Sequence, residues 1–497
     1  MLKKGLVSLR LMVVSVLTVS IAGAQNLGLT EFPIAVGEES AFCIGGAFGS
    51  TNGLFAILGD AQSRYNITAQ LISQTGISGS RISLGQATTA PFPAGLPLVA
   101  FDGTNYLVVW MKEITSTNYE VYGQFIDTSG NLVESAFLIA FLIATTNPTN
   151  PEEEDKLRAL AIAFGGNTYL VTWVNNGALI GRLIDKSGNL VGTEISINSS
   201  ARENAVAFDG TNYLVAWGNV IPDTDRTVSA QLVSQQGALV GENFIVDDSS
   251  YPSDNPISIG FDGSRYLIVF HEEMENEEWD LYGRFVTTAG TAAERIAIAD
   301  ETGNQQFPTI AFDGTNYLIT WFDGSTGSSK GRFFNISGTP LDLEFTIFVP
   351  LDGKFPLLTG VSFTPDRFCA ITTRVDEDFT DGDVYGAFIS PSTGIDERNS
   401  HSAPSAFELV GNYPNPFNAS TSIKYTLPQK AHVKIDIYNI QGQLVRTLSK
   451  GEKSSGTHIA VWDGKDNIGK NVSSGVYFFQ LKTPTGILEI RKMLLLR

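Results

Sequence analysis

Residues 100–110 read AFDGTNYLVVW, and this stretch decides the fold because close copies of it recur along the chain. With its phenylalanine as the marker, the copies stand at Phe48, Phe101, Phe164, Phe208, Phe261, Phe312 and Phe363. The intervals between them are 53, 63, 44, 53, 51 and 51 residues. A recurring period of this length indicates an array of similar structural units.

A second motif follows each copy of the first at a variable distance. Residues 121–133 read VYGQFIDTSGNLV, and residues 179–191 repeat them as LIGRLIDKSGNLV. Both motifs join two apolar, β-branched and aromatic runs through a short turn, which predicts two hairpins and four strands per repeat. We therefore predict an all-β chain in which residues 27–398 form a seven-bladed β-propeller of four-stranded blades. The repeat resembles kelch-type propellers in length and strand count, although it lacks their paired glycines.

The first motif predicts how the blades pack. Side chains alternate along a strand, so Tyr106, Val108 and Trp110 point to one face while Leu107 and Val109 point to the other. Both faces are apolar. This pattern is typical of a sheet that is covered on both sides by its neighbours.

The two ends of the array predict how the ring closes. The seventh repeat runs into the polar residues IDERNS without a fourth strand, and residues 27–36 (LGLTEFPIAV) supply the missing pattern. We expect this N-terminal strand to complete the last blade, which removes the open sheet edges. Closure makes Cys43 and Cys369 neighbours. In an exported protein they form either a disulfide or a pair of buried thiols.

Composition divides the chain into two modules of opposite charge. The net charge of −19 argues against a nucleic-acid partner, and four histidines and two cysteines leave little room for a zinc site. Residues 401–497 hold 12 Lys and Arg against 6 Asp and Glu, whereas the first 400 residues hold 21 against 46. Residues 399–406 read as the linker between a strongly acidic propeller and a basic C-terminal domain.

The N-terminus carries the features of a secretory signal peptide. A basic start is followed by an apolar run over residues 11–22 and by small residues at Ala22 and Ala24. We predict that residues 1–24 are removed, because this run is too short to span a bilayer comfortably. No other segment could cross a membrane as a helix, so the mature chain is expected to have no transmembrane helix.

Residues 407–497 alternate apolar and polar positions between turn signals about every ten residues, which predicts a small β-sandwich. They contain NYPNPFNAS, KIDIYNIQGQLVRTL and VWDGKDNIGKNVSSGVYFFQL, followed by the terminal RKMLLLR. This stretch resembles the C-terminal sorting domain of the type IX secretion system, which is akin to the Ig-like fold of flagellar hook-capping proteins. The residues that carry the resemblance are Asn412, Pro414, Asn415, Pro416, Phe417, Trp462, Asp463, Gly464, Gly475, Tyr477 and Lys492. Ala419 departs from the pattern, where a second proline is usual.

The resemblance implies an export route. After crossing the inner membrane on its signal peptide, the protein would be recognised through residues 407–497 by an outer-membrane secretion translocon. It would then be released, or held on the outer surface, after passage through the periplasm. An Ig-like module without a sorting role is the alternative.

The variable loops of the propeller are where a ligand site is expected, and they are acidic. Residues 271–280 hold six carboxylates, and residues 376–383 hold five. In the second loop Asp376, Asp378, Asp381 and Asp383 alternate as in a calcium loop, although the downstream Glu of that motif is missing. Calcium binding and a solvated acidic rim are the two interpretations, and no other cofactor is indicated. The Asp of each FDG turn, such as Asp102, is expected to cap its turn.

The propeller sequence shows no catalytic motif. Its one histidine, His271, stands in a run of charges, and a nucleophile elbow, a phosphate-binding glycine loop and an HExxH motif are all absent. We therefore predict a secreted or cell-surface binding protein with an unknown extracellular ligand, either a protein or a glycan. The alternative is a carbohydrate-active enzyme, a glycoside hydrolase or lyase, with carboxylates on the loop face at the mouth of the central tunnel.

Overall fold

The structure is a computed structural model, and its described residues form strands and turns without a helix. They fall into two compact units, of which one ends at Ser390 and the other occupies Pro391–Arg497. The structure describes residues 25–26, 29–36, 41–43, 45–49, 52–60, 65–88, 96–115, 118–143, 160–219, 227–248, 257–274, 278–341, 343–364, 366–376, 381–391, 407–413, 417, 421–427, 429–453, 456–483 and 486–496. The predicted signal peptide and linker lie outside these residues.

Seven antiparallel sheets built to one plan make up the described part of the first unit. The inner strands are β4 (Gly46–Phe48), β8 (Leu98–Phe101), β12 (Ala161–Phe164), β16 (Asn204–Phe208), β20 (Ser258–Phe261), β24 (Gln305–Phe312) and β28 (Phe355–Phe363). The second strands are β5 (Asn52–Asp60), β9 (Asn105–Thr115), β13 (Thr168–Asn175), β17 (Asn212–Gly218), β21 (Arg265–Glu273), β25 (Asn316–Asp323) and β29 (Phe368–Val375). The third strands are β6 (Tyr65–Ser73), β10 (Asn118–Asp127), β14 (Ala178–Asp185), β18 (Val228–Ser234), β22 (Trp279–Thr287), β26 (Ser328–Asn335) and β30 (Gly382–Ile389). The outer strands are β7 (Gly76–Thr88), β11 (Leu132–Ile143), β15 (Leu190–Asn198), β19 (Leu239–Asp247), β23 (Ala292–Ala299), β27 (Phe345–Phe348) and β2 (Glu31–Ala35).

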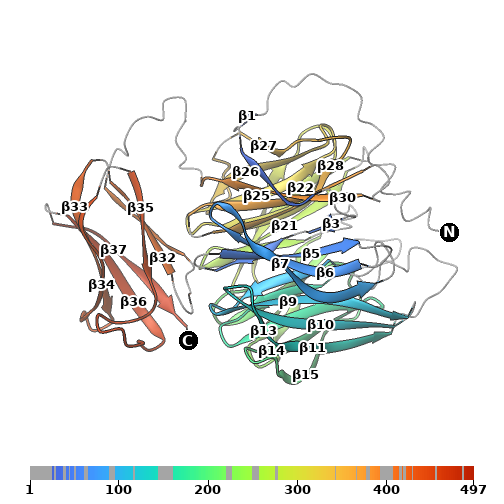
Figure 1. The fold of residues 1–497 in the computed structure, drawn as a ribbon, viewed down its shortest axis with the longest axis horizontal. Coiled ribbons are helices and arrows are strands. Elements are labelled where there is room, and N and C mark those ends of the chain that lie inside the picture. Colours follow the sequence, from blue (N-terminus) through green and yellow to red (C-terminus); the bar gives the residue numbers. More distant parts are fainter. Residues whose placement is uncertain are drawn as a thin grey trace. The chain divides into compact units, whose positions relative to one another are not determined.

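The inner strands show that these sheets form a ring. Each inner strand contacts the inner strands of the sheets before and after it, and β28 of the last sheet contacts β4 of the first. In every sheet but the last, the inner, second, third and outer strands follow in chain order, as β9, β10 and β11 do in Figure 1, whereas the outer strand of the last sheet is β2. Four-stranded sheets arranged radially in this way are a β-propeller.

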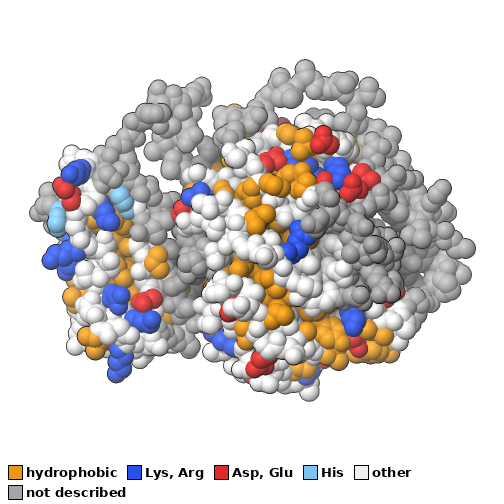
Figure 2. All heavy atoms as spheres, viewed as in Figure 1, with side chains coloured by type: hydrophobic (Ala, Val, Ile, Leu, Met, Phe, Trp, Pro, Cys, Tyr) orange, Lys and Arg blue, Asp and Glu red, His pale blue; other side chains and the backbone are white. Residues whose placement is uncertain are grey.

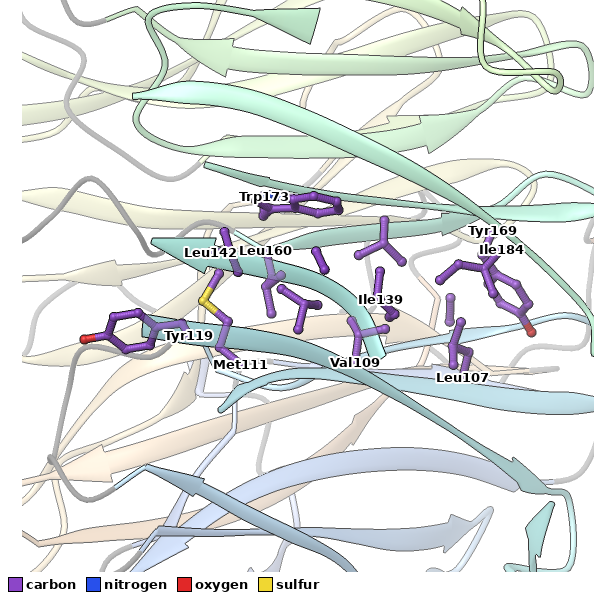
Figure 3. Close-up of a cluster of buried hydrophobic side chains, with 14 of the residues drawn as sticks. Leu107, Val109, Met111, Tyr119, Ile139, Leu142, Leu160, Tyr169, Trp173 and Ile184 are labelled. Atoms are coloured by element: carbon purple, nitrogen blue, oxygen red, sulfur yellow. The ribbon is translucent and has the colours of Figure 1, made fainter. Parts of the chain in front are cut away.

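Both faces of each sheet are buried, as the alternation in the first motif predicts. Tyr106, Val108 and Trp110 pack with residues of β5 and β6 in the preceding sheet. Leu107 and Val109 pack on the opposite face with residues of β13 in the next sheet, including Trp173, as Figure 3 shows. The predicted division of the motif between two faces is confirmed.

The same motif also supplies a polar contact between sheets. The hydroxyl of Tyr106 donates a hydrogen bond to the carbonyl oxygen of Asn52 in the preceding sheet, and Tyr213 does the same to Thr168.

The aspartate of the FDG motif caps the turn between the first two strands of a sheet. Asp102 Oδ1 accepts hydrogen bonds from the main-chain N–H groups of Thr104 and Asn105, both at 2.7 Å. Asp209, Asp262 and Asp313 make the equivalent bonds, so their predicted capping role is confirmed.

The N-terminal segment lies in the sheets at the end of the array. Strand β2 pairs antiparallel with β30 and is the fourth strand of the last sheet. Strand β1 (Gln25–Asn26) pairs parallel with β27, beside which it is drawn in Figure 1, and β3 (Ala41–Phe42) pairs with β5. Glu31 of β2 forms an ion pair of 2.8 Å with Arg374 of β29, whose side chain is only 1% exposed. A buried cation therefore binds the first described strands to the last sheet.

A bulge recurs between the third and outer strands. The side-chain amide of Gln124 in β10 donates to the carbonyl oxygens of Val133 and Glu134 in β11. Gln70 and Gln231 make the same pair of bonds to their outer strands. The bulge places one residue of the outer strand in the left-handed region, and that residue is glycine in three other sheets: Gly79, Gly192 and Gly241. In β11 it is Glu134, with φ of 59°.

The second unit is a two-sheet sandwich. One sheet contains β31 (Glu408–Tyr413), β32 (Thr421–Leu427) and β35 (Gly456–Trp462). The other has the order β34 (Leu444–Lys453), β33 (Ala431–Asn439), β36 (Gly475–Thr483) and β37 (Gly486–Leu495). One hydrophobic core fills the space between them. Among the residues that the structure describes, no helix has the length and apolar character needed to cross a membrane.

We predict that Glu134→Gly stabilises the propeller. A non-glycine residue in the left-handed region costs about 1–2 kcal/mol, whereas the greater freedom of glycine in the unfolded chain costs about 0.5–1 kcal/mol. The expected net gain is about 0.5–1 kcal/mol, measured as a higher urea midpoint for the propeller transition. The control Ser135→Gly, in the extended strand, should lower that midpoint. A lower urea midpoint for Glu134→Gly would show that Glu134 is not strained in the left-handed conformation.

Candidate functional site

The loop between β29 and β30 holds the residues predicted to bind calcium. Asp376 follows the end of β29, Asp381 precedes β30, and Asp383 is the second residue of β30. The main-chain N–H of Asp381 donates to Asp376 Oδ1 at 3.2 Å, so this carboxylate bonds to its own loop. Asp378 lies outside the described residues. The structure therefore brings three of the four predicted carboxylates to one loop.

A lysine binds two of these carboxylates. Lys354, in the turn before β28, places its ammonium 2.8 Å from Asp381 Oδ2 and 2.5 Å from Asp383 Oδ2. Burial by itself would lower the pKa of Lys354, but the two carboxylates outweigh it and hold the pKa above its ordinary value. No cluster of three His, Cys, Asp or Glu suited to a metal exists in the described part of the chain. Calcium binding by the complete loop stays a prediction.

Two other sheets contain charged clusters in which carboxylates also contact a cation. In the sheet of β24–β27, Lys330 lies between Asp323 and Glu344. Burial would raise the pKa of Asp323, but its bonds from Lys330 and Ser325 hold the pKa below its ordinary value. These bonds keep a buried carboxylate charged and compensated.

The third cluster lies where β19 meets the next sheet. Asp247 and Glu272 are almost fully buried there, and they form ion pairs with Arg284 and Arg295. The guanidinium of Arg295 also lies over the ring of Tyr282, at 3.3 Å from its centroid. Two acids and two bases make this cluster neutral overall. Both carboxylates are therefore paired inside the propeller, Asp247 across two sheets and Glu272 within one, which leaves them poorly suited to bind a ligand.

The seven inner strands, as far as the structure describes them, contain no group for acid–base chemistry. The inner strands β4, β8, β12, β16, β20, β24 and β28 include no Asp, Glu, His, Lys, Arg or Cys. Their polar residues are amides and hydroxyls, such as Asn204, Gln305 and Thr359, all of which are buried. A pair of catalytic carboxylates would therefore have to come from the loops and not from the inner strands.

His271 is buried against aromatic rings. Its ring centroid lies 4.6 Å from that of Trp279 and 6.1 Å from that of Phe307. Neither ring nitrogen has a hydrogen-bond partner among the described residues. Burial lowers the pKa of His271 to about 3, so the ring is neutral at physiological pH. In this structure it contacts no hydroxyl or thiol that it could activate.

The two cysteines lie in one buried cluster, and both thiols are free. The structure thus contains the predicted neighbourhood but not the disulfide. Thr373 of β29 holds this segment in place, because its hydroxyl bonds to both the N–H and the carbonyl oxygen of Cys43, each at 2.9 Å.

The residues that carry the sorting-domain resemblance lie mainly inside the sandwich. The Trp462 ring packs between Phe417 and Tyr477, at centroid distances of 5.5 and 5.0 Å. Phe417 also pairs through its main chain with the last strand, β37. Asn412 is buried and its amide donates to Thr421 Oγ1 at 3.0 Å. Pro414, Asn415 and Pro416 lie outside the described residues.

The remaining members of that set form a turn or lie on the surface. Asp463 Oδ1 accepts from the N–H of Lys465, and Gly464 follows with φ of 62°, a left-handed conformation. Gly475 begins β36, and Lys492 of β37 is exposed. Phe417, Trp462 and Tyr477 of this set thus belong to the core of the sandwich, and Lys492 is a member that a partner could reach.

Three residues in these contacts were not singled out by the sequence. Lys354 stands in a turn without a motif, Thr373 lies within a strand whose pattern is apolar, and Arg374 follows it. Each bonds to a residue of another segment. The partner of Thr373 lies 330 residues away in the sequence, and the partner of Arg374 lies 343 residues away. A period in the sequence reveals what the repeats share, whereas these contacts belong to one sheet only.

Comparisons with known proteins give one family match, in the C-terminal unit, and several distant structural similarities. Residues 417–486 match the family described as FlgD Ig-like domain. No curated protein matches the chain. Among solved structures, the β-propeller domain of the Trilobed protease from Pyrococcus furiosus is 12% identical, with a TM-score of 0.44, over 74% of this chain and 98% of that one. The polysaccharide lyase Uly1 is 8% identical, with a TM-score of 0.44, over 73% and 99%. The Dos1 propeller is 11% identical, with a TM-score of 0.39, over 90% and 98%.

We predict that Thr373→Val weakens ring closure. The substitution keeps the shape of the side chain but leaves the N–H and carbonyl oxygen of Cys43 buried without a partner. This should reduce the free energy of unfolding by about 1–3 kcal/mol, measured by urea denaturation. Dithiothreitol should leave the wild-type midpoint unchanged, because both thiols are free. A midpoint that falls on reduction would show that a disulfide closes the ring instead.

We predict that His271→Met makes the propeller less sensitive to acid. The folded state holds His271 neutral, so below pH 6.5 the unfolded state binds a proton that the folded state does not, and stability falls with pH. By pH 5 this loss is about 2 kcal/mol. Met occupies the equivalent buried position in β9, as Met111. The variant should lose about 2 kcal/mol less than wild type between pH 7.5 and 5, measured from urea midpoints. The exposed control His432→Gln should match wild type, and equal losses in all three proteins would contradict the assignment.

Proposed function

We propose that this protein is an exported binding protein, in which the propeller engages an extracellular ligand and the C-terminal sandwich is the export signal. The proposal of a binding propeller rests on where the charged side chains lie and how they are paired. Within the described residues the inner strands have no titratable side chain, and in each of the three charged clusters a Lys or Arg is paired with carboxylates. This arrangement supports a rigid display scaffold in preference to a catalytic centre.

The ligand is expected on the face that carries the variable loops. The connections between the second and third strands differ in length and composition from sheet to sheet. On the other face, four of the turns between the first and second strands are capped by an aspartate in the same way. Uniform turns are suited to a structural role, and variable loops to recognition. The acidity of these loops favours a ligand with basic groups, or a glycan held through hydrogen bonds.

The second half of the proposal rests on the C-terminal unit. Its match to the FlgD Ig-like domain family, the resemblance of its motifs to the type IX sorting domain and the signal-peptide pattern of residues 1–24 point in one direction. In this proposal the chain crosses the inner membrane first, and an outer-membrane translocon then recognises residues 407–497. The mature protein is secreted or held on the outer surface.

Deleting residues 407–497 tests the export role. The truncated protein should accumulate in the periplasm of a host that has the type IX system, because the translocon no longer recognises it. The measurement is the fraction of the protein that external protease can digest on intact cells. Wild type in a host without the translocon is the control for a trapped protein. Undiminished surface delivery of the truncated protein would refute the sorting role.

Binding can be separated from hydrolysis with the mature chain, residues 25–497. A glycan and protein array should show retained, unmodified ligands, because the inner strands supply no acid–base pair. Mass spectrometry of the captured glycans checks whether any is cleaved. Cleaved products would favour the carbohydrate-active enzyme, with carboxylates supplied by the loops.

A further inference from the structure

The solvent side of one sheet in the C-terminal unit carries an unusual row of like charges. Lys450 of β34 is the register partner of Lys434 of β33, which is in turn the partner of Lys482 of β36. Like charges directly opposite each other in a sheet are destabilising. On the same face, Phe478 of β36 is the partner of Lys492 of β37. A local arrangement that works against stability is expected where a sequence serves function.

We call this surface the lysine face, defined by Lys434, Lys450, Lys482, Lys492, Phe478 and Ile490. Its opposite side is the sandwich core, because the alternating residues Val433, Ile435 and Ile437 are fully buried there. Figure 2 shows Lys and Arg side chains, with hydrophobic side chains between them, over the region where Figure 1 draws β34, β36 and β37. Ile490 is 55% exposed at this surface.

A buried carboxylate fixes two of these lysines. Asp436 lies on the lysine side of β33, yet it is fully covered. Its Oδ2 lies 2.7 Å from the ammonium of Lys434 and 3.4 Å from that of Lys482, and its Oδ1 accepts from Thr447 at 2.6 Å. Lys482 also donates to the hydroxyl of Tyr438 at 2.9 Å. Lysine side chains usually lose much rotamer freedom on binding, and here two of them are already ordered.

The lysine face remains positive after this compensation. It carries four ammonium groups, two of which share the carboxylate of Asp436, within a domain that has 12 basic and 6 acidic residues. Glu452, at the end of β34, forms its own ion pair with Lys430 at 3.0 Å. The face thus combines ordered positive charge with two apolar side chains, Phe478 and Ile490. Such a surface is complementary to an acidic surface with an apolar centre.

We propose that the lysine face is the surface through which the C-terminal domain docks on an acidic protein of its export machinery. This inference rests on the proposed sorting function and names the contact. A protein is favoured over an anionic membrane because the face is the flat side of a sheet. Phe478 is half-buried there, whereas insertion below lipid headgroups requires apolar groups that protrude.

The test uses the full-length chain with Lys450→Glu and Lys492→Glu together. Both lysines are exposed and neither contacts Asp436, so the buried network is retained. The matched control is Lys465→Glu with Lys470→Glu, which makes the same change of charge in the loop before β36. Thermal unfolding of each purified protein verifies that it is folded. Surface delivery is measured by protease digestion of intact cells.

The lysine-face variant should reach the surface at least about tenfold less than wild type, which corresponds to about 1.4 kcal/mol of lost docking energy. The loop control should be delivered normally. An equal loss in both variants would mean that net charge alone matters and would overturn the proposal. Normal delivery of the face variant, when deletion of residues 407–497 traps the protein, would overturn the docking surface and leave the sorting role intact. Normal delivery of the deletion would overturn both.

A lipid partner gives a different result. Purified full-length protein is floated with vesicles of phosphatidylglycerol and phosphatidylcholine, and with vesicles of phosphatidylcholine alone. The proposal expects no flotation of wild type with either. Flotation with the anionic vesicles that the lysine-face variant loses would replace the acidic protein by a membrane and overturn the proposal as stated.

Discussion

The packing of apolar sheets on both faces is the constraint on which the propeller depends. Residues such as Leu107 and Val109 need one neighbour, and Tyr106, Val108 and Trp110 need another. A linear stack of such sheets would leave two apolar faces in water, whereas a ring leaves none. Closure is therefore a requirement of the packing. It is met where β28 contacts β4 and where β2 pairs with β30.

This constraint explains why the described charges are structural. The faces of the sheets are apolar, so a charge that is buried within or between sheets needs a partner. Asp247 with Arg284, Asp323 with Lys330 and Glu31 with Arg374 each meet that need. The acidity that dominates the sequence is thus partly used inside the ring. What remains for a ligand is the set of carboxylates on loops whose length differs between sheets.

The sequence could predict what the repeats share. The period, the four strands, the two apolar faces and the capping aspartates all recur, so one copy tests the interpretation of another. The contacts made once could not be predicted. The pairing of Lys354 with Asp381 and Asp383 and the Thr373 bonds to Cys43 depend on three-dimensional proximity and leave no period. The cysteines were correctly predicted to be neighbours, as both lie in one buried cluster. The residue of β29 that bonds to Cys43 could not be predicted from the sequence.

The C-terminal unit shows the same division between packing and recognition. Trp462, Phe417 and Tyr477 carry the resemblance to a sorting domain, yet they are buried and hold the two sheets together. A partner cannot read residues that it cannot touch, so these motifs identify the fold, and the exposed side chains must identify the cargo. Asp436 connects the two roles. It is as buried as the core residues, but it lies on the outer side of its sheet. There it holds the ammonium groups of Lys434 and Lys482 in place. A fully covered carboxylate is costly unless it is paired, and the lysines that pair with it are ordered at the surface as a consequence.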